Sequence, residues 1–205
     1  MEKFTVLKGV AAPLMLADVN TDLIVRMERL SRLSRGEFGP WTFESLRYLP
    51  DGSENPDFIL NQPPWRGANI VLAGENFGCG SSREAAVWAL RDYGIRCVVA
   101  PSFGDIFYGN CFENGMLPLR LHAAALEQLA GEARTAAGEF TVDLVAQRVT
   151  GSGGRSFAFD IDPRRRAALL QGLDAIGATL AHADAIAAFQ ARDRARRPWI
   201  YRAIN

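Results

Sequence analysis

Short apolar runs alternate with amphipathic stretches along most of the chain, and this pattern predicts the secondary structure. The expected buried strands span residues 4–10, 69–73, 96–100 and 117–121. The expected helices between and after them span residues 83–92, 103–110 and 123–136. From residue 68 onward, strands and helices therefore alternate, which predicts parallel strands joined by helical crossovers.

The stretch before residue 68 has a less regular pattern. A polar turn at 17–22 precedes a short apolar run at 23–30, which is expected to be helical with Asp22 as its cap. Residues 31–66 are interrupted by Gly and Pro at many positions and are expected to form a long loop. Loops of this length are uncommon inside a compact domain and are often functional.

The C-terminal third of the chain is expected to be a small β region followed by helices. The expected short β segments span residues 139–143, 145–150 and 156–160. Pro163 suits a first helical position, so helix is expected from there, with Gly177 as an interruption and Asp184 as the cap of residues 185–196. The basic residues at 192–197 are expected to be solvated or to contact a partner.

The most informative segment is residues 76–84, Asn-Phe-Gly-Cys-Gly-Ser-Ser-Arg-Glu, where an expected strand turns into an expected helix. Gly78 and Gly80 allow backbone conformations that other residues avoid, and they let a ligand approach closely. Ser81 or Ser82 is expected to cap the helix, whose N-terminus favours an anion.

Arg83 adds a planar guanidinium that binds a carboxylate or phosphate through two hydrogen bonds. The simplest alternative is that the Gly-Ser turn is only a helix cap. A dinucleotide-binding turn is excluded because its third glycine is replaced here by Arg83, and a phosphate loop is excluded because no Gly-Lys-Ser/Thr ending follows. The segment therefore indicates a site for a small anion.

Composition narrows the function classes. The chain has 205 residues, 48% of them hydrophobic, and its 23 basic side chains balance 23 acidic ones, which argues against nucleic acid as a partner. No apolar run approaches the roughly 18 residues of a membrane span, and no export signal is expected at the start. We therefore expect no membrane association and a cytoplasmic location.

The cysteines and histidines give little independent evidence of chemistry. Cys79, Cys97 and Cys111 are an odd number without metal-ligand spacing, so neither a disulfide framework nor a metal site is expected. Cys97 is expected in the core, and a catalytic thiolate at Cys79 would need a basic partner that the nearby sequence lacks. His122 and His182 are expected at the surface or as caps.

Several motifs together closely resemble the small-subunit family of 3-isopropylmalate dehydratase. They are residues 20–22, 55–61, 76–84, 100–112 and 172–177, so the resemblance covers nearly the whole chain. The Gly-x-Gly-Ser-Ser-Arg-Glu core of the motif at 76–84 also occurs in the wider aconitase superfamily. Nine ordered residues are far more specific than a lone glycine pattern.

The resemblance implies an α/β fold, the swivelling β/β/α domain of the aconitase superfamily. We expect residues 1–205 to form one such domain, with a core of about 1–160 and a C-terminal helical extension at 163–205. The family domain docks over a large subunit that holds a four-iron four-sulfur cluster. This chain is expected to bind no cofactor or metal itself and to be inactive alone.

The reaction implied by the resemblance is a hydro-lyase step of leucine biosynthesis. Water leaves 2-isopropylmalate and is added back to give 3-isopropylmalate, so the substrate is a small hydroxy-diacid. The first serine of the family motif is the base and maps to Ser81. A serine alkoxide needs nearby N–H dipoles and a cation, which residues 78–83 are expected to supply.

The remaining site residues are expected to bind substrate. Ser82 and Arg83 follow the base in the same motif, with Arg83 as the clamp for a carboxylate. Thr21 and Asp22 map to the family's Thr-Asp motif near the floor of the site. Arg32 lies in the loop expected to contact the substrate's variable group, as does Arg35.

Two departures from the family pattern lie close to this site. Ala85 stands where a histidine usually follows the motif, and residues 26–30 lack the usual proline. One alternative is therefore a paralogous hydro-lyase of the same family acting on citraconate, methylmalate or another substituted malate. An alternative of another class is a non-catalytic module that binds a diacid.

Overall fold

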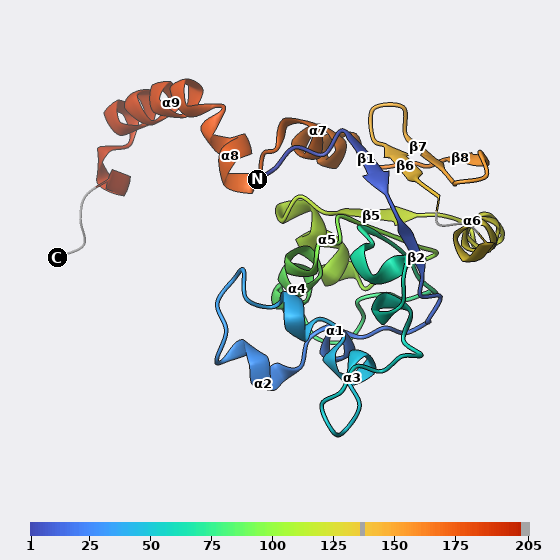
Figure 1. Cartoon of the computed structure of the whole chain (residues 1–205). Coiled ribbons are helices and arrows are strands. Elements are labelled where there is room, and N and C mark those ends of the chain that lie inside the picture. Colours follow the sequence, from blue (N-terminus) through green and yellow to red (C-terminus); the bar gives the residue numbers. More distant parts are fainter. Residues whose placement is uncertain (136–137, 202–205) are drawn as a thin grey trace.

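The computed structural model describes residues 1–135 and 138–201, which build two four-stranded sheets with helices around them (Figure 1). The parallel sheet has the order β2-β3-β4-β5, and the antiparallel sheet has the order β1-β6-β7-β8. The parallel sheet consists of β2 (Ala11–Pro13), β3 (Ile70–Leu72), β4 (Cys97–Ala100) and β5 (Leu117–Arg120). The parallel pairing expected from the alternation of strands and helices is thus confirmed.

The central strands β3 and β4 are buried on both faces, which explains why each appears in the sequence as a continuous apolar run. Val71 pairs in register with Ala12 on one side and Val98 on the other. Pro118 lies in β5, which is an edge strand. Proline has no N–H group, and at an edge no further strand needs a hydrogen bond from that position, so proline is tolerated there.

The antiparallel sheet brings the start of the chain next to residues that follow more than 130 positions later. It consists of β1 (Val6–Gly9), β6 (Phe140–Asp143), β7 (Arg148–Thr150) and β8 (Ser156–Ala158). Val6 pairs with Asp143 and Gly9 with Phe140. The first expected strand, 4–10, is therefore real but shorter, and the chain then continues directly into β2 in the other sheet.

The side chains of the parallel sheet divide between two hydrophobic clusters. Val71 and Val98 belong to the cluster under α4 (Ala85–Tyr93) and α5 (Asp105–Glu113). Leu72 and Val99 belong to a second cluster with the antiparallel sheet, α6 (Ala123–Thr135) and α7 (Pro163–Gln171). Antiparallel sheet, parallel sheet and helices form successive layers (Figure 1), which confirms the expected β/β/α fold.

Residues 31–66 are more structured than the sequence predicted. They contain short helices that are too brief to produce a periodic pattern: η1 (Gly39–Trp41), α3 (Glu44–Arg47), η2 (Ile59–Asn61) and η3 (Trp65–Gly67). Phe38, Phe43 and Leu60 in this segment are at most 1% exposed and belong to the first cluster. The segment is therefore part of the core.

The expected helix at 23–30 is two helices, α1 (Thr21–Ile24) and α2 (Met27–Leu30). Asp22 does not cap it, because the first helix begins at Thr21 and Asn20 is the cap, accepting a hydrogen bond from the Leu23 N–H at 2.8 Å. Asp22 is instead in the first turn, which leaves its carboxylate free to contact other segments.

The C-terminal segment leaves the body of the molecule and forms an arm (Figure 1). After α7, it consists of α8 (Ala175–Leu180), α9 (Ala183–Arg196) and η4 (Pro198–Tyr201). Gly177 lies inside α8 instead of interrupting it, and His182, not Asp184, is the N-cap residue of α9. Several large apolar side chains of the arm are exposed, namely Ile176, Leu180, Ile186, Phe189, Trp199 and Ile200.

Two expectations extend beyond the described residues. The helix expected at 123–136 is described as far as Thr135, and the helical extension expected to reach residue 205 is described as far as Tyr201. Among the residues that the structure describes, no helix has both the length and the apolar character needed to cross a membrane.

Candidate active site

Three loops meet at the carboxyl edge of the parallel sheet. The turn 76–84 follows β3, the loop 14–20 follows β2, and the loop 101–104 follows β4. The carboxyl ends of neighbouring parallel strands lie side by side, and this edge is where open α/β sheets bind their ligands. The turn 76–84, which has the most candidate site residues in the sequence, therefore also lies where this fold favours a ligand site.

Backbone hydrogen bonds hold the turn against the loop that follows β2. The Gly78 N–H donates to the carbonyl oxygen of Val19 at 2.7 Å, and the Thr21 N–H donates to that of Cys79 at 2.9 Å. The Ser81 N–H donates to the Thr21 hydroxyl oxygen at 3.1 Å. Thr21 is 1% exposed, so its hydroxyl group is a buried anchor for the backbone of Ser81.

The loop after β4 holds the other side of the turn. The Phe77 N–H donates to the carbonyl oxygen of Ser102 at 3.1 Å, and the Gly104 N–H donates to that of Phe77 at 2.9 Å. Gly78 has a φ of 74°, and a Cβ atom there would lie 2.2 Å from the ring of Phe107. Both the positive φ and the close approach explain why the sequence has glycine at this position.

Arg83 and Asp22 are joined across the site by a hydrogen-bonded ion pair. The Arg83 Nη1 lies 2.5 Å from the Asp22 Oδ1, and the two side chains are 23% and 57% exposed. Ion pairs with this much exposure contribute little to stability. Asp22 therefore positions the Arg83 guanidinium through a weak contact, and the carboxylate of a ligand can take the place of the Asp22 side chain.

The expected capping role of Ser81 and Ser82 is wrong. Helix α4 begins only at Ala85, and its N-cap is Glu84, which makes no side-chain capping bond within the described residues. The turn is held open by its bonds to the two flanking loops, so the helix starts later than the serines would require. Their hydroxyl groups are consequently not occupied by a cap.

The turn also presents backbone donors. In the described part of the chain, the N–H groups of Ser82 and Arg83 donate no hydrogen bond. They precede the N-terminus of α4, a nine-residue helix whose dipole adds positive potential at this end. Ser81 is half-buried, whereas Ser82 is exposed, so the two hydroxyl groups have different surroundings. The site can stabilise negative charge on an oxygen at Ser81.

Among the described residues, neither Arg32 nor Arg35 forms a side-chain hydrogen bond or ion pair with the turn. Arg32 is exposed, and its side chain forms no hydrogen bond or ion pair with another described residue. The Arg35 Nη2 donates to the Asn114 Oδ1 at 2.7 Å, and its guanidinium lies 5.6 Å from the centroid of the Trp88 ring. Arg35 therefore ties the loop 31–38 to α4 and α5.

A residue that the sequence pattern did not single out lies nearer the site. Arg26 and Asp22 both line an open groove of about 510 Å³ along α1 and α2. Arg26 is four residues after Asp22 and contacts Glu28 at 3.5 Å. In a continuous helix, the four-residue spacing between Asp22 and Arg26 would place both side chains on one face. The chain instead breaks between α1 and α2, so this spacing alone did not predict that they line one groove.

The cysteines do not fit an iron–sulfur cluster in this chain. Cys97 and Cys111 are fully buried, and burial raises the pKa of both thiols, which disfavours the thiolate that a cluster needs. Cys79 lies in the turn and is half-buried. Across residues 1–135 and 138–201, no three His, Cys, Asp or Glu side chains are grouped so that they could hold a metal ion.

Family models match successive parts of the chain. Residues 1–124 match the aconitase C-terminal domain, and residues 127–163 match a model described as LeuD_N. Residues 176–203 match the C-terminal domain of the 3-isopropylmalate dehydratase small subunit. These matches together cover the turn, the two sheets and the C-terminal arm.

Full-length relatives agree with these models. The chain is 52% identical over 200 residues to the 3-isopropylmalate dehydratase small subunit of Rhodospirillum centenum, covering 97% of this chain and 98% of that one. It is 51% identical over 201 residues to the one from Xanthobacter autotrophicus, covering 98% and 100%. A solved structure from Methanocaldococcus jannaschii, titled 3-isopropylmalate dehydratase, has the same fold, with a TM-score of 0.66, 23% identity and coverage of 90% and 99%.

Proposed function

The chain belongs to the 3-isopropylmalate dehydratase small-subunit family, and from this premise we propose that it converts 2-isopropylmalate to 3-isopropylmalate together with a large subunit. The reaction removes water to give an unsaturated diacid and then adds water at the adjacent carbon. It is a hydro-lyase step of leucine biosynthesis. The observation that carries the proposal is the clamped turn that presents Ser81 beside the Arg83–Asp22 pair.

We assign Ser81 as the base that takes the proton from the carbon next to a carboxylate. A serine hydroxyl is a weak base unless its alkoxide is stabilised. The N–H groups of Ser82 and Arg83, the helix N-terminus behind them and the Arg83 guanidinium are the groups available for this. Thr21 supports the assignment because it fixes the Ser81 backbone through a hydrogen bond of 3.1 Å.

We assign Arg83 as the clamp for a substrate carboxylate and Asp22 as the group that positions it before substrate arrives. When a substrate carboxylate takes the place of Asp22, two of the five N–H donors of the Arg83 guanidinium can bind both of its oxygens. Ser82 is exposed beside them and is proposed as a further donor to substrate. Arg32 is proposed to contact the variable group of the substrate from the neighbouring loop.

The partner and cofactor are proposed from the family. We infer that this edge of the sheet is covered by a large subunit, and that this partner holds the four-iron four-sulfur cluster that acts as the Lewis acid for the hydroxyl group. The cysteines of this chain support that division, since two of them are buried thiols with raised pKa values. A cytoplasmic location is proposed because free thiols persist in a reducing compartment.

The test is an anaerobic assay with a cluster-loaded large subunit, following the unsaturated diacid formed from 2-isopropylmalate. We expect Ser81→Ala to lower turnover by at least about a hundredfold, in line with the loss of a positioned base. Ser53→Ala is the control, because Ser53 is exposed and, among the described residues, its side chain bonds only to Asp51. Citraconate and methylmalate run in parallel as competing substrates.

Turnover of 2-isopropylmalate that depends on both subunits and on Ser81 supports the proposal. Turnover of only a smaller diacid replaces it with the paralogous activity, with Ala85 as the first residue to restore to histidine. Equal turnover by wild type and Ser81→Ala removes Ser81 from the role of base.

A further inference from the structure

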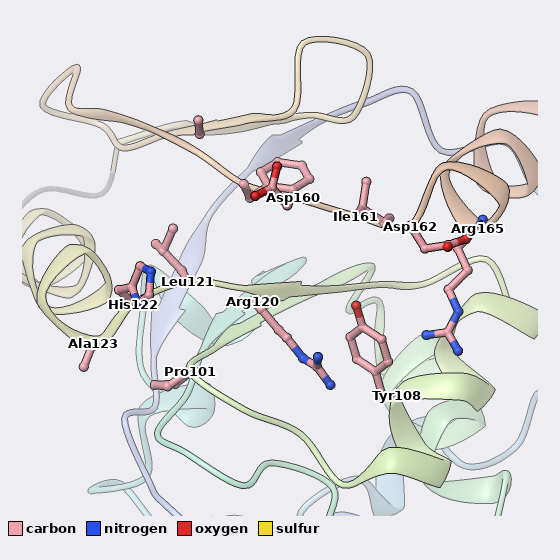
Figure 2. A pocket seen from close by; sticks show the side chains of 12 residues that line it. Pro101, Tyr108, Arg120, Leu121, His122, Ala123, Asp160, Ile161, Asp162 and Arg165 are labelled. Atoms are coloured by element: carbon pink, nitrogen blue, oxygen red, sulfur yellow. Dashed lines mark hydrogen bonds between the residues drawn. The ribbon is translucent and has the colours of Figure 1, made fainter.

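A second cavity lies on the other side of the loop that follows β4, where the two sheets and α7 come together. Its volume is about 840 Å³, which is within the range of sites for small organic ligands. Tyr108 from α5, Arg120 from the end of β5 and Arg165 from α7 form one wall (Figure 2). None of these residues belongs to the candidate active site, so the proposed reaction does not explain why they are grouped.

The two arginines lie against the same aromatic ring. The guanidinium carbon of Arg120 is 4.2 Å from the centroid of the Tyr108 ring, and that of Arg165 is 5.0 Å from it. Figure 2 shows the Tyr108 ring between the two guanidinium groups. Cation–π contact holds each group in place without neutralising its charge.

In the part of the chain that the structure describes, neither arginine is paired with a carboxylate. Across the described residues, the side chains of Arg120 and Arg165 form no ion pair and no hydrogen bond. Two like charges that share one cavity repel each other, and an anion that contacts both removes this repulsion. The guanidinium fork matches carboxylate and phosphate oxygens, and the Tyr108 hydroxyl adds a donor.

The carboxylates that also line the cavity do not fill this position. The Asp162 Oδ1 accepts hydrogen bonds from the backbone N–H groups of Arg164 and Arg165, each at 3.0 Å, so it serves as the cap of α7. Asp160 lies on the wall opposite the two guanidinium groups (Figure 2). His122 and the start of α6, a thirteen-residue helix, add further donors at the far end of the cavity.

We propose that Arg120, Arg165 and Tyr108 form a second anion-binding site, separate from the turn at 76–84. Its ligand is a small organic acid or phosphate ester whose carboxylate or phosphate group contacts both guanidinium groups. The remaining volume accommodates an uncharged part of the ligand against Leu121 and Ile161. Tyr108 lies in α5, Arg120 in β5 and Arg165 in α7. A bound ligand therefore contacts both the helical layer and α7, the helix that precedes the C-terminal arm.

The experiment measures binding of succinate and of inorganic phosphate to the full chain alone by calorimetry at low salt, and follows the Arg Nε–Hε signals by NMR. We expect Arg120→Gln and Arg165→Gln each to weaken binding by about tenfold, and raised salt to weaken it further. Arg164→Gln is the matched control, since Arg164 neighbours Arg165 on α7 but does not line this cavity.

Arg83→Gln separates this site from the candidate active site. Binding that survives Arg83→Gln and is lost in the Arg120→Gln/Arg165→Gln double variant establishes the second site, and succinate against phosphate then distinguishes the two ligand sources. Failure of both probes to bind the wild type at millimolar concentration overturns the proposal. Binding that only Arg83→Gln abolishes also overturns it, and leaves the role of the turn intact.

Discussion

Replacing Gly78 with alanine is the most direct test of how the turn at residues 76–84 is built. Gly78 has a φ of 74°, and an added Cβ atom would lie 2.2 Å from Cγ of Phe107. Phe107 is 2% exposed, and its ring packs edge-on against Phe77 with the centroids 5.5 Å apart. The ring therefore has little room to move away from the new methyl group.

The expected loss of stability follows from two separate costs. A left-handed backbone conformation costs a non-glycine residue roughly 1–2 kcal/mol. Forcing an extra carbon into a packed site costs typically about 1–3 kcal/mol. The sum of about 2–5 kcal/mol is a large part of the roughly 5–15 kcal/mol by which a folded domain is stable.

The assay is equilibrium unfolding in urea, with two control variants that separate the two costs. Gly36 has a φ of 100° with open space around it among the described residues, so Gly36→Ala measures the backbone cost alone, roughly 1–2 kcal/mol. Gly109 lies in α5 and also faces open space among these residues, so Gly109→Ala is expected to stabilise by up to about 1 kcal/mol. A Gly78→Ala variant that loses no more stability than Gly36→Ala would refute the clash.

Three further outcomes are expected. Asn114 is 1% exposed and bonds Arg35 and Glu84 through its side chain, so Asn114→Ala should lower the free energy of unfolding by about 3 kcal/mol in urea titrations; an unchanged midpoint would contradict this. The Arg29 guanidinium lowers the pKa of Glu44 below its ordinary value of 4.5, so the pair stabilises the fold above that pH and loses its contribution as pH falls through the lowered folded value. Unfolding of Glu44→Gln should accordingly depend less on pH in this acidic window, and an identical pH profile would exclude the pair. Asp22→Asn should change stability by less than about 1 kcal/mol, because its pair with Arg83 is exposed, yet raise the KM for the diacid in the reconstituted complex; an unchanged KM would show that Asp22 does not position Arg83.

The parallel sheet could be predicted from the sequence because its strands are buried on both faces. Residues Ile70–Leu72 and Cys97–Ala100 are apolar at every position, and each is followed by a polar loop and a helix. The antiparallel pairing of Val6 with Asp143 had no comparable signal. It joins two short strands that are far apart in sequence, and nothing local specifies which strands will pair.

The helix caps could not be predicted because tertiary contacts decide where the helices begin. Asn20, Asp22, Ser81 and Ser82 are all residue types that cap helices well. The hydrogen bond from the Thr21 N–H to the Cys79 carbonyl fixes both segments, and it leaves Asn20 in the capping position while keeping the serines outside α4. The same contact therefore overrides the local capping preference, and it leaves the hydroxyl groups of Ser81 and Ser82 without a capping role in α4.

The grouping of Thr21, Asp22, Ser81 and Arg83 came from the family motifs, whereas the structure shows what each contributes to the turn. The buried Thr21 hydroxyl accepts from the Ser81 N–H, so it fixes the backbone, and Asp22 holds Arg83 through an exposed ion pair, so that contact can exchange. A rigid backbone with one exchangeable carboxylate contact suits a site where a diacid must enter, react and leave. In the proposed function, the contact that a substrate carboxylate replaces is the exposed ion pair between Asp22 and Arg83, while the hydrogen bond from the Ser81 N–H to Thr21 stays in place.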